Sequence, residues 1–199
     1  MPEPIRKVIF TESQIHSAVE QMAKSVLAWL KENKTNVLNL ISILEGARPL
    51  TGDMANCLQK IAPDVRIKIY EIRIQGTDGH QNLLADREVK EDSLDFEALC
   101  LHSVLVVDDL VDSGLTLKKI KDQLLAKGIE DVRTAVLIRK FGVASGPVDF
   151  LGFDLNLDHQ ALAQEGFKDC WLFGYGMDLD GKYRDHHQVE GLYLSLEGH

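Results

Sequence analysis

The spacing of apolar residues near the amino end of the chain has the period of a helix. Thr11 is followed three residues later by Gln14, which is the form of a helix capping box. Beyond this pair, apolar side chains recur every three or four positions, and they are Ile15, Val19, Met22, Val26 and Leu30. The pattern predicts an amphipathic helix that packs one face against the rest of the protein.

Apolar runs and helical spacing then alternate along most of the chain. We expect strands at residues 37–44, 65–74, 104–107, 134–138, 150–153 and 171–175, and helices at residues 50–61 and 115–127, with Gly128 ending the second helix. This alternation predicts an α/β fold with a central, mostly parallel sheet flanked by helices. Ligands of such sheets bind outside the carboxyl ends of the strands, so the loops there are candidate sites.

One stretch, residues 75–95, interrupts the alternation. It is polar and rich in charge and contains Gly76 and Gly79, so we expect a mobile loop. The chain shows no internal repeat or low-complexity tract. Because 45% of its 199 residues are hydrophobic, it can bury one substantial core, and we expect a single domain over residues 1–199.

Charge and composition narrow the range of partners and compartments. A net charge of −9 opposes broad contact with nucleic acid or an anionic membrane, since both attract cationic surfaces. The amino end lacks the apolar run of a signal peptide, and no window approaches the roughly 20 apolar residues that cross a bilayer. Cys57, Cys100 and Cys170 form no CxxC pair, so we expect reduced thiols in a soluble, cytoplasmic protein.

The stretch VLVVDDLVDSGLTL carries the most informative chemistry in the chain. Asp108 and Asp109 end an apolar strand, and the chain then turns into a helix at Gly114, where positive φ and close approach of a ligand are allowed. Amides at the start of a helix attract a phosphate, to which Ser113 and Thr116 can donate hydrogen bonds. The two acids instead suit ribose hydroxyls and a hard cation such as magnesium. The string therefore predicts a site for a sugar phosphate.

A plainer interpretation remains open for these residues. Asp108 and Asp109 could simply end a strand, with Asp112 or Ser113 capping the helix that follows. A histidine pair, His186 and His187, also invites a metal interpretation. Adjacent residues on a strand point to opposite faces and no third ligand lies nearby in sequence, so we expect these histidines to be solvated.

The acidic stretch resembles the phosphoribosyl diphosphate motif of type I phosphoribosyltransferases. The similarity extends to the hypoxanthine-guanine branch of that family, through the segments FTESQIHSAVEQMAKSV, ISILEGA, VDFLGF and WLFGYGMDLDGKYRD. It implies a core of about residues 35–155 and a small hood formed by about residues 1–12 and 156–199. It also implies an enzyme that joins a purine to phosphoribosyl diphosphate with Mg²⁺, as a homodimer or homotetramer.

The resemblance also implies a role for individual residues. Phosphoribosyl diphosphate would contact Leu44, Glu45, Gly46, Arg48, Asp108, Asp109, Asp112, Ser113, Gly114, Leu115, Thr116 and Arg184. The purine would contact Lys140, Trp171, Leu172 and Asp178, and magnesium would contact Asp108, Asp109 and Asp178. Asp112 is the expected acid and base for the purine nitrogen. Taken singly, Trp171 could be a core residue, Lys140 a solvated strand end and Arg184 part of a surface ion pair.

This sequence departs from the family at two places. The family's diphosphate loop usually reads Leu-Lys-Gly, often with a cis first peptide bond, whereas here it reads Leu44-Glu45-Gly46. We hypothesise that Arg48 supplies the missing cation. The family's closing loop usually carries a Ser-Tyr pair, and residues 75–95 contain none.

These departures leave a second class of function open, a non-catalytic protein of the same fold that senses a nucleotide or phosphoribosyl diphosphate. Asp112, Lys140 and Trp171 together favour the enzyme. Two further classes are disfavoured: a dinucleotide-binding domain would need a GxGxxG motif after a strand, and a transcriptional regulator would need a basic patch or a helix pair for DNA.

Overall fold

The computed structural model describes residues 5–73, 94–141, 148–157 and 159–195. Its helices are α1 (Glu12–Glu32), α2 (Arg48–Ile61), α3 (Phe96–Cys100), α4 (Leu115–Ala126) and α5 (His159–Gln164). Its strands are β1 (Ile5–Phe10), β2 (Val37–Leu44), β3 (Arg66–Arg73), β4 (Ser103–Val111), β5 (Val132–Arg139), β6 (Phe150–Asp154), β7 (Phe167–Phe173) and β8 (Val189–Ser195). The described strands form a five-stranded and a three-stranded sheet.

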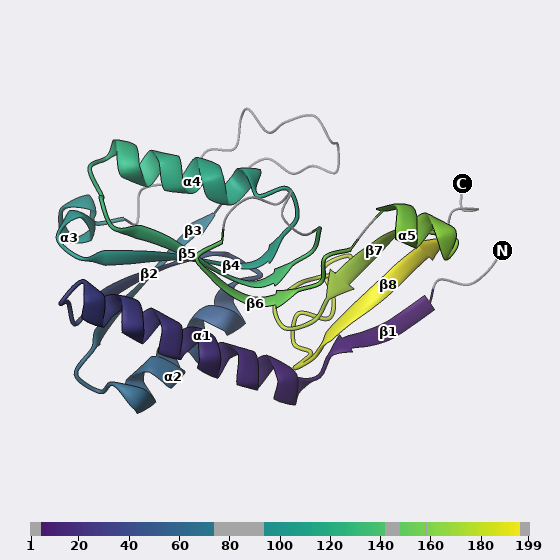
Figure 1. Ribbon diagram of the computed structural model, residues 1–199, viewed down its shortest axis with the longest axis horizontal. Coiled ribbons are helices and arrows are strands. Elements are labelled where there is room, and N and C mark those ends of the chain that lie inside the picture. The colour runs from purple at the N-terminus through teal and green to yellow at the C-terminus, as the bar shows by residue number, and fades with distance from the viewer. Residues whose placement is uncertain (1–4, 74–93, 142–147, 158, 196–199) are drawn as a thin grey trace.

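The larger sheet is parallel, with strand order β3-β2-β4-β5-β6, and helices cover both of its faces (Figure 1). Alternation along β4 explains the two layers, because successive side chains of a strand point to opposite faces. Leu105 and Val107 join the apolar cluster under α1 and α2, whereas Val104 and Val106 join the cluster under α3 and α4. The prediction of a central parallel sheet flanked by helices is confirmed.

The first helix follows its sequence pattern closely. Thr11 and Gln14 form the reciprocal capping box, and every apolar residue of the predicted stripe is buried. The strand at residues 37–44 also has its predicted bounds, and Gly128 after α4 has a φ of 88°. Burial of a continuous apolar face accounts for this agreement, because the helical period can be read directly from the sequence.

Two predictions about strands are wrong. The strand predicted at residues 104–107 continues through both acids to Val111. The strand predicted at residues 171–175 lies at Phe167–Phe173 and pairs antiparallel with β8, outside the parallel sheet. An apolar run indicates that a strand forms but carries no information about its partner, and here the partner lies near the carboxyl end of the chain.

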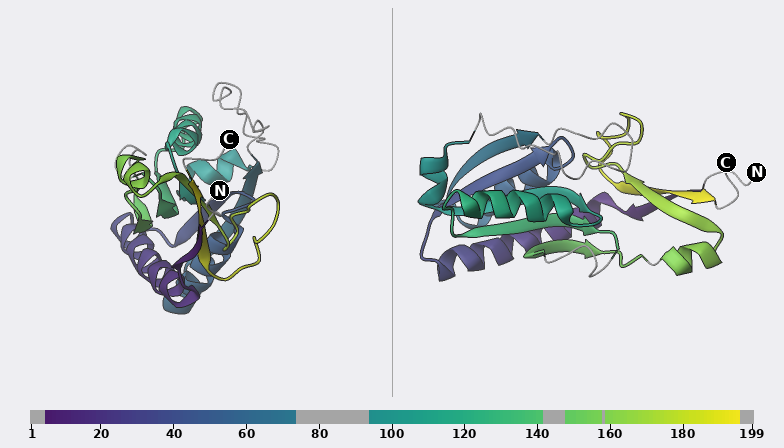
Figure 2. Two further views of the ribbon diagram at one scale, coloured as in Figure 1. Left: turned by 90° about the vertical axis from the view of Figure 1, so that its right-hand side faces the viewer. Right: turned by 90° about the horizontal axis from the view of Figure 1, so that it is seen from above.

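The three-stranded sheet has the order β1-β8-β7 and lies at one end of the molecule, beyond the larger sheet (Figure 2). It draws on both chain ends that were predicted to form a hood, although neither β1 nor β8 was predicted as a strand. The hydroxyl of Tyr175, just after β7, donates to Asp53 Oδ2 of α2 over 2.6 Å. This partly buried hydrogen bond ties the segment after β7 to α2. The extent of the single domain, residues 1–199, stays a prediction.

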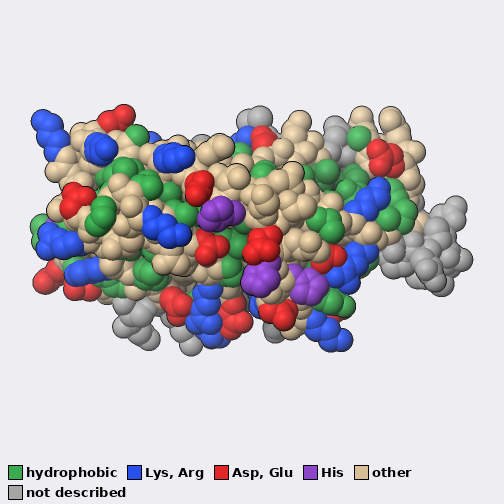
Figure 3. Space-filling view, turned by 90° about the horizontal axis from the view of Figure 1, so that it is seen from below, with side chains coloured by type: hydrophobic (Ala, Val, Ile, Leu, Met, Phe, Trp, Pro, Cys, Tyr) green, Lys and Arg blue, Asp and Glu red, His purple; other side chains and the backbone are tan. Residues whose placement is uncertain are grey.

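On the side of α1 and α2, basic and acidic side chains are interspersed (Figure 3). Within the described part of the chain, no helix combines the length and apolar character that crossing a bilayer requires.

Glu190 on β8 is the centre of a polar cluster in the three-stranded sheet. Its buried carboxylate pairs with the guanidinium of Arg6 on β1, and it also accepts from Gln188 over 3.2 Å and lies 2.9 Å from Nδ1 of His186. The hydrogen bond from Arg6 is the main reason that the pKa of Glu190 falls from 4.5 to about 2. Glu190 therefore stabilises the fold above about pH 4.5, and this contribution is lost as the pH falls through about 2.

Replacing Glu190 by glutamine is expected to lower the free energy of unfolding by about 2 kcal/mol at pH 7, between the values typical of exposed and of buried ion pairs. Urea unfolding followed by circular dichroism would measure the loss. The difference from the parent protein should shrink between pH 5 and pH 2, because over this range the unfolded chain takes up a proton at Glu190 while the folded chain keeps the carboxylate ionised. Glu20→Gln, in an exposed pair with His16, is the control and should change little. A difference that did not depend on pH would contradict this account.

Candidate active site

The loops that follow β2, β4 and β5 meet at one edge of the parallel sheet, since the carboxyl ends of parallel strands share an edge. Glu45 and Gly46 follow β2, and Asp112 to Gly114 follow β4. Lys140 follows β5, and its amide donates to the carbonyl of Val111 over 3.0 Å. The register of the sheet thus brings the loop at Asp112 beside Lys140.

The turn between β4 and α4 has the geometry expected for an anion site. Gly114 is the N-cap of α4, with φ 72°. The alternative interpretation, in which Asp112 or Ser113 is the cap residue, is therefore wrong about the position of the cap. The first turn of α4 begins at Leu115, and the positive end of the helix dipole at this place favours an anion.

Asp108 and Asp109 lie just before this turn, beyond the last residue of β4 that pairs with β2. Asp108 accepts from the amide of Asp109 over 3.1 Å, and Asp109 accepts from that of Leu110 over 2.8 Å. Burial, followed by the charge of Asp109, raises the pKa of Asp108 well above its usual value. Burial also raises the pKa of Asp109, and hydrogen bonds, first the one with Asp108, partly offset this effect. The two desolvated acids favour a ligand that donates hydrogen bonds or carries positive charge.

The loop after β2 is packed tightly between its neighbours. The peptide bond between Leu44 and Glu45 is cis. A Cβ atom added to Gly46 would lie 1.8 Å from Oδ2 of Asp109. One added to Gly176, where φ is 96°, would lie 2.1 Å from the carbonyl oxygen of Gly46. Both positions therefore need glycine, and the loop lies directly between Asp109 and the segment after β7.

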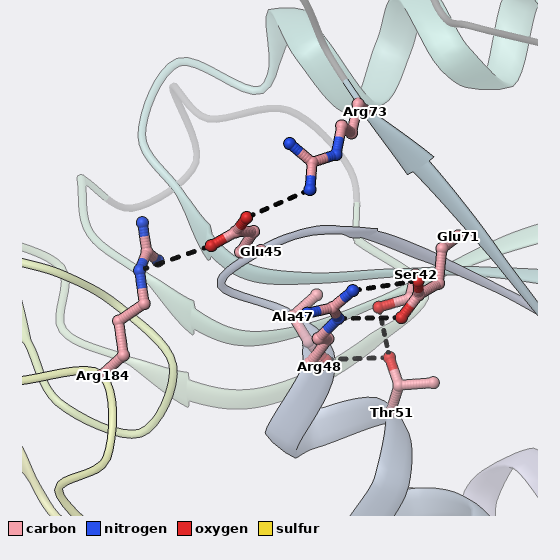
Figure 4. A network of polar contacts seen from close by, with 8 residues as sticks. All are labelled: Ser42, Glu45, Ala47, Arg48, Thr51, Glu71, Arg73 and Arg184. Atoms are coloured by element: carbon pink, nitrogen blue, oxygen red, sulfur yellow. Dashed lines mark hydrogen bonds and ion pairs between the residues drawn. The ribbon is translucent and has the colours of Figure 1, made fainter. Parts of the chain in front are cut away.

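Glu45 points between two arginines (Figure 4). Its Oε1 lies 3.3 Å from Nη2 of Arg73, and its Oε2 lies 4.0 Å from Nε of Arg184. Arg48, the predicted replacement for the family's lysine, instead forms two hydrogen bonds with Glu71, of 2.8 and 3.1 Å. The role of Arg48 stays a prediction, and the direct partner of its side chain is Glu71 on β3.

The residues predicted to contact the purine lie just after β5, on β7 and in the segment beyond β7. Lys140 is buried, and its ammonium lies 2.7 Å from Oδ1 of Asp169, so the alternative of a solvated strand end is wrong. Trp171 is 49% exposed and Leu172 is buried. Asp178 pairs with Nη2 of Arg184 over 2.6 Å. The exposed ring of Trp171 leaves a face for stacking, and it is not a core residue.

Three residues at this site were missed by sequence reasoning. The sequence pattern places Arg73 only within a strand, and it predicts no role for Asp169 or Gly176. Only the arginine offered a signal, as a cation at the carboxyl end of a predicted strand. Most of the predicted loop at residues 75–95, up to residue 93, lies outside the described residues.

A hollow of about 440 Å³ lies at the opposite edge of the sheet, where the parallel strands begin. Its described lining consists of Asn33, Thr35, Cys100, Leu101, His102, Ser103, Glu130 and Asp131. This lining contains two carboxylates and neither lysine nor arginine, so it does not suit a phosphate. The chemistry for a sugar phosphate is at the other edge.

The fold and this site define the class of protein. Residues 11–148 match the family described as the phosphoribosyl transferase domain, and the chain belongs to that family. The predicted resemblance to its hypoxanthine-guanine branch is confirmed. The chain is 28% identical over 186 residues to the hypoxanthine-guanine phosphoribosyltransferase of Dictyostelium discoideum, covering 90% of this chain and 91% of the relative.

Other relatives bear the same name. The hypoxanthine-guanine phosphoribosyltransferase of Crithidia fasciculata is 30% identical over 187 residues, which cover 90% of this chain and 81% of the relative. The crystal structure of the L. donovani enzyme of that name has a TM-score of 0.75 at 24% identity, covering 94% of this chain and 100% of the other. The hypoxanthine phosphoribosyl transferase of Trypanosoma cruzi has a TM-score of 0.76 at 23% identity, covering 94% and 90%. These structural likenesses concern the fold.

Proposed function

We propose that the chain transfers a 5-phosphoribosyl group from phosphoribosyl diphosphate to a purine base, hypoxanthine or guanine and with xanthine as a further candidate. The products are a nucleoside monophosphate and diphosphate, in purine salvage. The observation that carries this proposal is the turn at residues 108–116, which joins two partly buried acids to the start of α4 at Gly114.

In the proposed complex, the 5-phosphate lies against the amides from Asp112 to Thr116, with hydroxyl donors from Ser113 and Thr116. The ribose hydroxyls donate to Asp108 and Asp109, which meets the need of these acids for hydrogen-bond donors. The diphosphate lies along the loop Leu44-Glu45-Gly46, within reach of Arg184. The contacts for the 5-phosphate and for the ribose hydroxyls thus come from a single turn of the chain, and the contacts for the diphosphate come from elsewhere.

Mg²⁺ is the cofactor that this donor set fits, because hard cations prefer carboxylate oxygens and neither of the two partly buried acids forms an ion pair with a described side chain. Asp108 and Asp109 would hold it against the sugar, and Asp178 would help to hold a second ion. When bound, Mg²⁺ neutralises the charge of the diphosphate leaving group. The ion pair between Asp178 and Arg184 opens if Asp178 turns to a metal ion.

The purine lies between Trp171 and the end of β5 in this proposal. Lys140 donates to the exocyclic oxygen of the base, Leu172 presents its backbone to the pyrimidine edge, and the ring of Trp171 stacks on the base. Asp112 accepts the proton of the imidazole nitrogen as that nitrogen attacks the anomeric carbon and the bond to diphosphate breaks. Asp169 fixes the ammonium of Lys140 and is therefore a positioning residue.

A sensor of nucleotides or phosphoribosyl diphosphate is the second candidate. One observation favours it: the carboxylate of Glu45 lies beside Arg73 and Arg184, where an enzyme of this family would usually place a lysine. The proximity of Asp112, Lys140 and Val111 supports the enzyme instead, because a sensor needs no proton-transfer group beside the purine.

Two measurements test the proposed function. Calorimetry with magnesium should detect binding of phosphoribosyl diphosphate and of nucleoside monophosphates, and no heat from either would contradict the sugar-phosphate site. Incubation with magnesium, phosphoribosyl diphosphate and each of hypoxanthine, guanine and xanthine should yield a nucleotide. Binding without turnover on any base would establish the sensor. We propose a cytoplasmic homodimer or homotetramer, which light scattering at several concentrations would test.

A further inference from the structure

The carboxylate of Glu45 bridges two guanidinium groups at the place where the proposed function puts the diphosphate. Its two oxygens face different partners, Arg73 at 3.3 Å and Arg184 at 4.0 Å (Figure 4). An anion held between two arginines is the arrangement that a diphosphate group also seeks. The carboxylate of Glu45 therefore occupies a position that would also suit a negatively charged ligand.

Two of the three guanidinium nitrogens of Arg184 already have partners. Its Nη1 donates to the carbonyl of Gly176 over 2.7 Å, and its Nη2 pairs with Asp178 over 2.6 Å. The remaining nitrogen, Nε, is the one that faces Glu45. A diphosphate that reaches Arg184 along the loop at Gly46 consequently meets the carboxylate of Glu45 first.

Arg73 extends the same cluster from the end of β3. Its side chain is well exposed, and its ion pair with Glu45 joins β3 to the loop after β2. The neighbouring pair of Arg48 and Glu71 has two hydrogen bonds of its own, and it is close enough for Arg48 to feel the charge of Glu45. Arg73 and Arg184 are thus the two cations with which Glu45 forms ion pairs.

We propose that Glu45 is a built-in competitor of diphosphate, which occupies Arg73 and Arg184 in the free protein and withdraws when diphosphate binds. This inference rests on the proposed function. The Glu45 side chain is 44% exposed, and exposed ion pairs are weak, so a ligand with several negative charges can displace it. The retained charge of Glu45 then repels the bound diphosphate and weakens its binding, which favours release of that product.

The test is calorimetric binding of diphosphate, once with a metal chelator and once with magnesium. Glu45→Gln keeps the size of the side chain and removes its charge. It should tighten diphosphate binding about 5- to 20-fold, the range expected when one exposed pair and one nearby like charge are removed. The dissociation rate of diphosphate, measured by stopped flow, should fall in parallel. Glu20→Gln, a glutamate of similar exposure on α1, should leave binding within about twofold of the parent protein.

A double-mutant cycle separates the arginines from a general effect of charge. In an Arg73→Ala protein, the gain from Glu45→Gln should fall to about twofold, because one of the two released cations is missing. An undiminished gain would show that Glu45 acts without Arg73 and would overturn the proposal. Weaker diphosphate binding in Glu45→Gln would also overturn it, since Glu45 would then help to hold the ligand.

Ribose 5-phosphate is the second probe, because it needs the turn at Gly114 but not the cluster around Glu45. Binding of ribose 5-phosphate, together with unchanged diphosphate affinity in Glu45→Gln, would overturn the inference and leave the proposed function intact. If the parent protein bound neither ribose 5-phosphate nor diphosphate, the proposed function itself would be contradicted.

Discussion

Asp112→Asn is expected to lower kcat for nucleotide formation by about 10²- to 10⁴-fold, the range typical of a general acid or base. The amide keeps the shape of the side chain but cannot accept the proton of the purine nitrogen. The affinity for phosphoribosyl diphosphate should change little, because backbone amides and Asp108 and Asp109 make most of the proposed contacts with the sugar. Steady-state kinetics with each base, together with calorimetry for the sugar substrate, would separate the two effects.

The control is Asp122→Asn, an exposed aspartate on α4 that pairs with Lys118 at 2.6 Å. Its kinetics should match those of the parent enzyme. If Asp112→Asn turned over at a near-normal rate, another group would have to move the proton, and the assignment of Asp112 would be wrong. Rescue of activity at high pH would not be expected, because asparagine has no titratable group.

Gly46→Ala is expected to lower kcat/KM for phosphoribosyl diphosphate by about 100-fold, the loss that a displacement of about 1 Å can produce at a reacting centre. The new methyl group would lie 1.8 Å from Oδ2 of Asp109, so either the loop after β2 or the carboxylate of Asp109 must move. Both are proposed to hold the sugar substrate. The loss should appear in binding of phosphoribosyl diphosphate as well as in turnover.

Gly52→Ala provides the matched control, since a Cβ atom there meets nothing within 4 Å. Gly52 lies within α2, where alanine is the better helix former by about 1 kcal/mol, so this variant should be slightly more stable and fully active. Thermal unfolding of both variants would show whether Gly46→Ala remains folded. A folded Gly46→Ala protein with normal kinetics would contradict the proposed place of the diphosphate.

Part of the fold and site could be predicted because the relevant interactions are local. The capping box at Thr11 joins residues three apart, and the helical stripe that follows it is a period within one segment. The turn into α4 is similar, because Gly114 adopts its positive φ within the loop itself. The parallel order of the sheet follows from the alternation of strands and helices, since parallel neighbours need long connections.

The sequence was less informative where a strand or a charge depends on a distant partner. The pattern at residues 171–175 indicated an apolar strand but not the pairing of β7 with β8, which places it outside the parallel sheet. The reversed charge at Glu45 was evident, and Arg48 was the nearest cation in sequence. In the structure, Glu71 holds Arg48, and Arg73 lies beside Glu45 although 28 positions separate the two residues.

The sequence by itself therefore determined the alternating α/β architecture, the buried first helix and the turn that carries the proposed sugar-phosphate site. These depend on hydrophobic periodicity and on backbone preferences within a few residues. Only the tertiary structure decided which cations face Glu45, that Asp169 fixes Lys140, and that Gly46 lies against Asp109. Such contacts join residues far apart in the chain, and their geometry arises only when the sheet has formed.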